Sequence, residues 1–337
     1  MHRIDLIITT YNRSEKIKSL LVQLLSIITR NGDIIVVDSS DIPIRDKISG
    51  IQIKYIYSCH KNQPYQRYLG FLSSKAEILI FIDDDLEVVD DEFIKKVDEL
   101  FNEEGLAGIA LKFENKHKST SLTIIPGSKF VGNEGQLQKL KRYITGYPQL
   151  APGKFGLCGN KGLQPSGGGT TEWVSGGAFA ARRSVLFQDF NFQLFDIFED
   201  GLGMGEDGII GYGLSKQGGL IYNDELFFLH NDQKDSTYST DMYKFARRVA
   251  FSRLYLSLEK TRLDNANLLL ARIRFHYYMF WRLAGLFLNY LLNPSKERKE
   301  MLFGSINGWW LAVGFRFDKS LSRNEYWHNE AMKDLSK

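Results

Sequence analysis

Three consecutive carboxylates follow an apolar run with the character of a buried strand. The run Ile78-Leu79-Ile80-Phe81-Ile82 leads directly into Asp83, Asp84 and Asp85. Side chains alternate along an extended chain, so Asp83 and Asp85 are expected to face one site while Asp84 faces away. Adjacent carboxylates repel one another, and their oxygens suit Mg²⁺ or Mn²⁺. We therefore predict a divalent cation held by Asp85 and Asp83, with coordination positions left for substrate phosphates.

The acidic triplet is also compatible with roles that involve no metal-bound diphosphate. An acidic turn that caps the next helix needs no chemistry at all. A haloacid-dehalogenase-like phosphatase would use Asp83 as its nucleophile, but the strand here is the fourth rather than the first, and Glu87 replaces the expected Thr or Val. A dinucleotide oxidoreductase is disfavoured, because no glycine fingerprint follows the first apolar run.

Polar residues at other strand ends are expected to meet the triplet, because ligands bind at the carboxyl edge of a parallel sheet. These residues are Thr10, Tyr11 and Arg13 after the first run, and Asp38 after the second. The carboxylate of Asp38 can accept a hydrogen bond from a nucleobase, or it can simply cap a loop. Arg67, on a helix predicted over residues 63–74, can bind a diphosphate with two hydrogen bonds, or form a surface salt bridge.

A second group of candidates follows the middle of the chain. A strand predicted over residues 173–181 begins with Trp173 and contains Gly176 and Gly177, which permit close approach of a ligand. Glu206 and Asp207 open a helix predicted over 205–217. Either carboxylate can be a helix cap, and either can be the general base that acts opposite the metal.

His230 follows a short apolar strand predicted over residues 226–229, after another over 220–222. It is a candidate metal ligand, and the alternative is a strand-end histidine with only structural partners.

The elements that position these residues alternate between strand and helix. The predicted strands cover residues 4–9, 34–37, 51–57, 78–82 and 106–112, and the predicted helices cover 14–29, 63–74 and 91–102. The strand runs are continuously apolar, as expected of strands covered on both faces. The order predicts an α/β fold, Rossmann-like, with a mostly parallel sheet flanked by helices.

The chain divides into two predicted regions, with a boundary in the polar segment 232–240. Residues 1–235 form the predicted catalytic domain, which changes in character at about residue 112. Residues 114–172 are polar and rich in Gly and Pro, and a segment of this kind is usually a functional loop or lid. Residues 236–337 form a helical, basic and aromatic C-terminal region, helical to about residue 315.

The composition excludes a small secreted protein held together by disulfides. The chain has 337 residues, 25% of them charged, and two cysteines. Too few cysteines are present for a disulfide framework, so we expect a reducing, cytoplasmic location. The net charge of +3 is uneven: residues 244–300 carry twelve Lys or Arg and four Asp or Glu, which gives +8.

The C-terminal charge and aromatic content predict a surface for an anionic membrane. The stretch 275–292 is apolar but includes His276, Arg282 and Asn289, so it suits a helix lying on lipid better than one that spans it. We expect peripheral contact through residues 240–315, on the inner face of the cell membrane. A helical bundle packed on the catalytic domain, or a contact between subunits of a homo-oligomer, is the alternative. Nucleic acid is disfavoured because no recognition motif accompanies the charge.

Six short motifs occur in one order and together resemble a family 2 glycosyltransferase of GT-A fold over residues 3–232. They are residues 9–13 (TTYNR), 36–40 (VVDSS), 66–70 (QRYLG), 81–85 (FIDDD, which includes a DXD motif), 176–178 (GGA) and 205–207 (GED).

The resemblance implies a metal-dependent enzyme that inverts the anomeric carbon. Residues 1–112 would form the nucleotide-sugar half of the catalytic domain and residues 113–235 the acceptor half. The part 153–169 would close over a bound donor, and its Lys154 or Lys161 would stabilise charge on the leaving diphosphate. Thr10 and Asp38 would hold the base and ribose, Arg67 the base or diphosphate, and Asp207 would be the base. Asp83 would contact the ribose or the metal, and Asp85 the metal. Tyr11, Arg13 and Asp84 join the donor site, and Trp173, Gly176, Gly177 and Glu206 the acceptor side. The chain departs from the family at Ser39 and Tyr68, where Asp and Asn are common.

The expected reaction is a single displacement from a UDP-sugar, or from a dTDP- or GDP-sugar, to a hydroxyl of a glycan or lipid-linked acceptor. Such a step belongs to polysaccharide biosynthesis at the cell envelope. A non-catalytic protein that binds nucleotide or sugar on the same scaffold is the alternative from another class.

Overall fold

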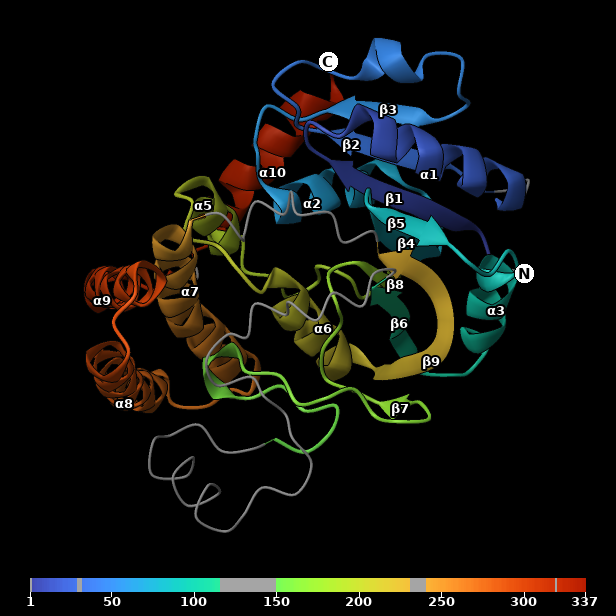
Figure 1. The fold of residues 1–337 in the computed structure, drawn as a ribbon. Helices are drawn as coiled ribbons and strands as arrows, with labels where there is room; N and C mark the ends of the chain where they lie inside the picture. The colour runs from blue at the N-terminus through green and yellow to red at the C-terminus, as the bar shows by residue number, and fades with distance from the viewer. Residues whose placement is uncertain (1, 29–31, 116–149, 231–240, 319) are drawn as a thin grey trace.

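The computed structural model describes residues 2–28, 32–115, 150–230, 241–318 and 320–337. Within these residues one mixed sheet runs through the molecule in the strand order β3-β2-β1-β4-β8-β6-β9-β5, with β7 paired to β9 (Figure 1). The strands are β1 (Ile4–Thr10), β2 (Ile34–Asp38), β3 (Lys54–Tyr57), β4 (Ile78–Asp83), β5 (Leu86–Val88), β6 (Leu106–Asn115), β7 (Gly169–Thr170), β8 (Ala178–Arg182) and β9 (Gly219–His230).

The first four strands are parallel and bring their polar ends to one edge, as the sequence predicts. In register, Thr10 lies opposite Asp38 of β2, and Thr9 lies opposite Asp83 of β4. Every residue of β1 and β2 is buried, which agrees with strands covered on both faces. The carboxyl ends of β1, β2 and β4 therefore form the edge that carries the acidic triplet.

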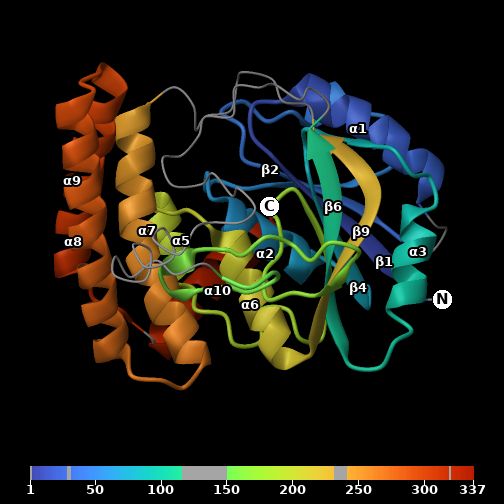
Figure 2. The ribbon, with the colours of Figure 1, turned by 60° about the horizontal axis from the view of Figure 1, so that its bottom comes forward.

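The second half of the sheet differs from the prediction. The strand expected over residues 173–181 begins only at Ala178, and β8 is antiparallel to both β4 and β6. The two short strands expected over 220–222 and 226–229 are one long strand, β9, which curls around this end of the sheet (Figure 2). The sequence did not predict β5, which pairs with β9 and places His230 opposite Leu86.

Helices cover both faces of the sheet because each has an apolar stripe that matches one core layer. On one face lie α1 (Ser14–Ile27) and α3 (Phe93–Leu100), and on the other lie α2 (Gln63–Ser73), α5 (Gln193–Glu199) and α6 (Glu206–Gln217). Two short 3₁₀ helices, η1 (Arg45–Ile48) and η2 (Leu157–Gly159), shape the connecting loops.

The C-terminal region is helical, as predicted, but it extends further than expected. Helices α7 (Met242–Leu263), α8 (Leu268–Leu292) and α9 (Lys296–Gly314) pack beside α6 (Figure 2). They form a further hydrophobic core together with residues of α5, α6 and η2. Beyond the predicted helical end, α10 (Leu321–Leu335) returns to the sheet domain, where Asp334 accepts a hydrogen bond of 3.1 Å from Tyr65 of α2. Within the described residues, no helix combines the length and the apolar character needed to cross a membrane.

Candidate active site

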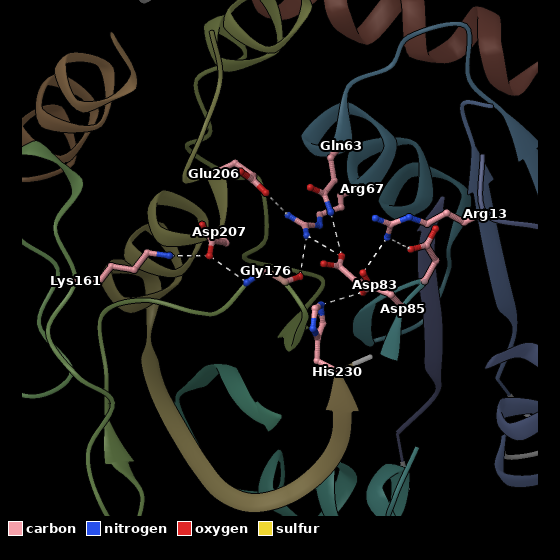
Figure 3. A network of polar contacts seen from close by, with 11 residues as sticks. Arg13, Gln63, Arg67, Asp83, Asp85, Lys161, Gly176, Glu206, Asp207 and His230 are labelled. Carbon is pink, nitrogen blue, oxygen red and sulfur yellow. Dashed lines mark hydrogen bonds and ion pairs between the residues drawn. The ribbon is translucent and has the colours of Figure 1, made fainter. Parts of the chain in front are cut away.

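The acidic triplet lies at the carboxyl edge of the sheet, beside the end of β9. Asp83 ends β4, and Asp85 lies in the tight turn that leads into β5. Oδ1 of Asp85 lies 3.4 Å from Nε2 of His230, and its Oδ2 accepts a hydrogen bond of 2.9 Å from Arg13. Oδ1 of Asp83 accepts a hydrogen bond of 3.0 Å from Gln63 (Figure 3). Pairing of β5 with β9 thus brings His230 to Asp85.

Negative charge at this edge is only partly compensated. Burial raises the pKa of Asp83 to about 8; Arg67 opposes this rise, and the neighbouring Asp85 and Asp84 add to it. Burial also acts to raise the pKa of Asp85, but the hydrogen bond with His230 and the charge of Arg13 lower it overall. A buried carboxyl group whose ionisation is disfavoured by neighbouring carboxyl groups marks a place where a cation would be stabilised.

The donor set at this edge fits Mn²⁺ or Mg²⁺. The oxygens of Asp83 and Asp85 suit either ion, and the His230 imidazole suits Mn²⁺. Within the described part of the chain, no three His, Cys, Asp or Glu side chains converge as a complete metal cage. The protein groups would therefore hold the ion together with oxygens from a bound substrate.

Asp84 and Thr10 bind one another inside the protein. The Thr10 hydroxyl donates a hydrogen bond of 2.7 Å to Oδ2 of Asp84, and Arg13 donates one of 2.8 Å to Oδ1. Both Asp84 and Thr10 are buried. The pair joins the end of β1 to the acidic turn, so contact of either residue with a donor would require this pair to open.

Asp38 is fully buried and shapes the loop that follows β2. Its carboxylate accepts hydrogen bonds from the Ser40 N–H (2.8 Å), the Ile44 N–H (2.9 Å) and the Tyr55 hydroxyl (2.6 Å). Asp38 has no exposed surface in this structure, so the direct contact with a nucleobase expected from the sequence would require this loop to open.

Asp41, an exposed carboxylate beside Tyr11, was not singled out by the sequence. It accepts hydrogen bonds from the Tyr11 hydroxyl (3.1 Å) and the Asn12 amide (2.7 Å), and it pairs with Lys61. The Lys61 ammonium also lies 5.2 Å from the centre of the Tyr11 ring. Tyr11 is therefore a predicted donor residue that remains on the surface.

Arg67 crosses the site from the donor half to the acceptor half. Only 1% of it is exposed, although the sequence suggested a diphosphate ligand or a surface salt bridge. Its guanidinium donates hydrogen bonds to Glu206 (3.0 Å) and to the Gly176 carbonyl (2.9 Å), and lies 3.4 Å from Asp83 (Figure 3). These contacts use both terminal nitrogens, so Arg67 positions the two halves in this structure.

Asp207 lies at the opposite end of this network, in the first turn of α6. Its Oδ2 accepts hydrogen bonds from the Lys161 ammonium (2.7 Å) and from the Gly176 N–H (3.0 Å). Burial acts to raise the pKa of Asp207, but Lys161 and then the N–H of Gly208 and the charge of Arg67 lower it overall. Asp207 is thus held ionised, as a general base must be at the start of a reaction.

Glu206, the neighbouring candidate base, differs from Asp207 in the direction of its pKa shift. Burial and the charge of Asp207 raise its pKa, against the lowering effect of Arg67. It is buried and bonded to Arg67, so of the two carboxylates Asp207 is the better placed to take a proton.

Of the predicted acceptor residues, Gly176 contacts Asp207 directly, and Trp173 contacts its partner Lys161. The Lys161 ammonium lies 4.9 Å from the centre of the Trp173 ring, and Gly176 links Asp207 to Arg67 through its N–H and carbonyl. Gly177 packs against Phe113, whose ring a Cβ at this position would approach to 2.8 Å. Glycine is thus needed at 177 for packing.

The polar segment 114–172 lies partly outside the described residues, because residues 116–149 are not described. In the described part, Lys154 pairs with Glu172 at 2.7 Å, and Arg253 of α7 donates a hydrogen bond of 2.9 Å to the Cys158 carbonyl. Lys161 was considered for the diphosphate, and in the structure it binds the candidate base instead.

The first half of the chain matches a known protein family. The model of "Glycosyl transferase family 2" matches residues 5–162, which include the acidic triplet and Arg67. This match favours a glycosyltransferase over the phosphatase and the oxidoreductase that were considered for the acidic triplet. No curated protein sequence matches the chain.

The fold is similar to that of solved glycosyltransferases. Residues 1–349 of TarS from S. aureus in complex with UDP-GlcNAc align with a TM-score of 0.50 and 13% identity, covering 99% of this chain and 88% of that one. The mannosyltransferase PcManGT from Pyrobaculum calidifontis, in complex with GDP-Man and Mn²⁺, gives 0.48 and 12%, covering 99% and 87%. The chain thus has the GT-A fold of these solved glycosyltransferases, and its residues 5–162 match glycosyl transferase family 2.

Proposed function

We propose that this glycosyltransferase moves a sugar from a nucleoside diphosphate to an acceptor hydroxyl by a single, inverting displacement. The observation that carries the proposal is the arrangement of two acidic ends in one network. Asp83 and Asp85 lie at the donor end, Asp207 lies at the acceptor end, and Arg67 and Gly176 connect them (Figure 3).

The donor end would hold the diphosphate and the cation. Asp85, Asp83 and His230 would hold Mn²⁺ or Mg²⁺, and a bound ion would stabilise the negative charge that develops on the leaving diphosphate. Tyr11 and Arg13 line this end, with Asp41 as the exposed acceptor near Tyr11. Asp38, Thr10 and Asp84 would support the donor from behind, through the loops they hold. A UDP-sugar is the first donor to test, since TarS, on the same fold, was solved with UDP-GlcNAc.

The acceptor end would supply the base. The acceptor oxygen attacks the anomeric carbon, the bond from that carbon to the phosphate oxygen breaks, and the hydroxyl proton passes to Asp207. Attack on the face opposite the leaving group inverts the anomeric carbon. Lys161 keeps Asp207 ionised before the reaction, and it must yield room for the acceptor hydroxyl. A positioned base of this kind contributes about 10²–10⁴ in rate.

The acceptor we propose is a glycan or a lipid-linked glycan, used in polysaccharide synthesis for the cell envelope. This places the enzyme in the cytoplasm, at the inner face of the membrane. The C-terminal helices are the proposed point of membrane contact.

The experiment that tests the proposal is a donor screen followed by product analysis. UDP-, GDP- and dTDP-sugars are added with Mn²⁺, and the anomeric configuration of any transferred sugar is read by NMR. We expect transfer from one nucleotide class, with a β-linked product from an α-linked donor. A product that keeps the donor's configuration would contradict the single displacement.

A further inference from the structure

The side of α8 and α9 that faces away from the sheet domain is apolar and exposed. We call it the outer face and define it by Ile273, Phe280 and Leu291 of α8 and by Phe303, Trp310 and Val313 of α9. Between 49% and 74% of each of these residues is exposed, with Trp310 the most exposed. Figure 2 shows α8 and α9 as the outermost layer, with α7 between them and α6. Apolar side chains of this size on two adjacent helices mark a binding surface.

Helix α9 buries its small residues and exposes its large ones. A Cβ at Gly304 would lie 2.3 Å from the Tyr243 carbonyl oxygen of α7, and one at Gly308 would lie 2.3 Å from that of Arg247. Only glycine permits this close approach of α9 to α7. The side chains of Phe303 and Trp310 therefore have no place in the protein core, and α9 presents them outward.

Helix α8 carries one apolar stripe along its whole length. Residues 273, 280 and 291 are separated by seven and eleven positions, which places them on one side of a helix. Ile273 and Leu291 are 18 positions apart, so the stripe is about 27 Å long. A surface that is long, apolar and parallel to two helix axes suits a flat partner.

The positive charge around the outer face favours an anionic partner. Residues 268–316 contain seven Lys or Arg and two Glu, and α8 itself contains no acidic residue. Arg274, Lys296, Lys299 and Arg316 are exposed. A second copy of this face would bring arginine against arginine with few carboxylates to compensate, whereas anionic lipid headgroups supply the opposite charge.

We propose that the outer face of α8 and α9 binds the surface of an anionic lipid bilayer, with both helices parallel to the membrane plane. The aromatic and aliphatic side chains enter the boundary between headgroups and acyl chains, and the exposed basic residues contact the headgroups.

The same helices connect the proposed membrane surface to the acceptor end of the active site. Helix α7 packs against α9, and on its other side it contacts η2, where a Cβ at Gly159 would approach Leu256 to 2.4 Å. Two residues beyond η2, Lys161 pairs with Asp207. The acceptor end is thus connected to the helices of the outer face, which favours a lipid-linked acceptor. This step rests on the proposed sugar transfer, whereas membrane binding by the outer face does not.

Vesicle flotation of the full chain, without donor or metal, tests the proposal. We expect the wild type to float with vesicles of phosphatidylglycerol and phosphatidylcholine and to stay at the bottom with phosphatidylcholine alone. The variant Phe280→Ser with Trp310→Ser removes two exposed aromatic side chains, and we expect its partition to fall by about tenfold or more.

The matched control is Val22→Ser with Leu321→Ser, which removes two exposed apolar residues outside the outer face. We expect it to float like the wild type. Equal recovery of wild type with and without anionic vesicles would overturn the proposal. So would a stable oligomer in sedimentation equilibrium that Phe280→Ser with Trp310→Ser dissociates, because a second copy would then cover the face. Loss of transfer with intact flotation would count against the proposed function alone.

Discussion

The two acidic ends of the active site differ in how their charge is compensated. At the donor end, burial and neighbouring carboxylates raise the pKa of Asp83 to about 8. At the acceptor end, the Lys161 ammonium lies 2.7 Å from Asp207 and helps to lower the pKa of that carboxyl. At the first end the nearby Arg13 and Arg67 do not overcome this rise, whereas at the second end Lys161 helps to keep Asp207 ionised. In the proposed mechanism, similar carboxylates therefore acquire a metal-binding or a proton-accepting role from their neighbours.

The largest expected effect comes from neutralising the acceptor end. Asp207→Asn removes the proton acceptor and keeps its size, so we expect kcat to fall by about 10²–10⁴. Donor affinity, measured by calorimetry, is expected to stay within about threefold of wild type, because Asp207 does not contact the donor end.

Asp200→Asn is the matched control, because Asp200 is an exposed acid outside the network. We expect it to transfer sugar at the wild-type rate. If Asp207→Asn retained most of its turnover, the base would have to be another group, and Glu206→Gln would be the next variant to measure.

A smaller effect is expected on the pH dependence of kcat/KM, which tests the acceptor end separately from the donor end. Lys161→Met removes the nearest positive charge from Asp207, so the pKa of Asp207 rises and it is protonated up to a higher pH. We expect the acidic limb of kcat/KM to move to higher pH by about one unit or more. Arg67 and Glu206 also act on Asp207 and remain in place in this variant.

Lys154→Met is its control, since Lys154 belongs to the same segment but pairs with Glu172. Its pH profile is expected to match that of the wild type. An unchanged acidic limb in Lys161→Met would show that this lysine does not control the base.

The donor half could be predicted because its signals are local. Continuous apolar runs identified β1, β2 and β4, and parallel pairing then requires Asp83 and the end of β1 to share an edge. The acidic triplet was informative for the same reason, since its residues are adjacent in sequence.

The remaining parts of the site depend on contacts between distant residues. The polar interval 223–225 interrupts the apolar pattern of β9, so one strand was predicted as two. The burial of Asp38 depends on Tyr55 and on the Ile44 N–H, and no local pattern indicates those partners. The pairing of Lys161 with Asp207 spans 46 positions, and only the folded chain brings the two together.

The central claim is that Asp83 and Asp85, at the carboxyl edge of the sheet, hold a cation that binds a nucleoside diphosphate. Calorimetry of a UDP-sugar with and without Mn²⁺, on the wild type and on Asp85→Asn, measures this directly. The account predicts Mn²⁺-dependent binding to the wild type, weakened about tenfold or more in the variant. Equal donor binding with and without Mn²⁺, or an affinity unchanged by Asp85→Asn, would contradict it.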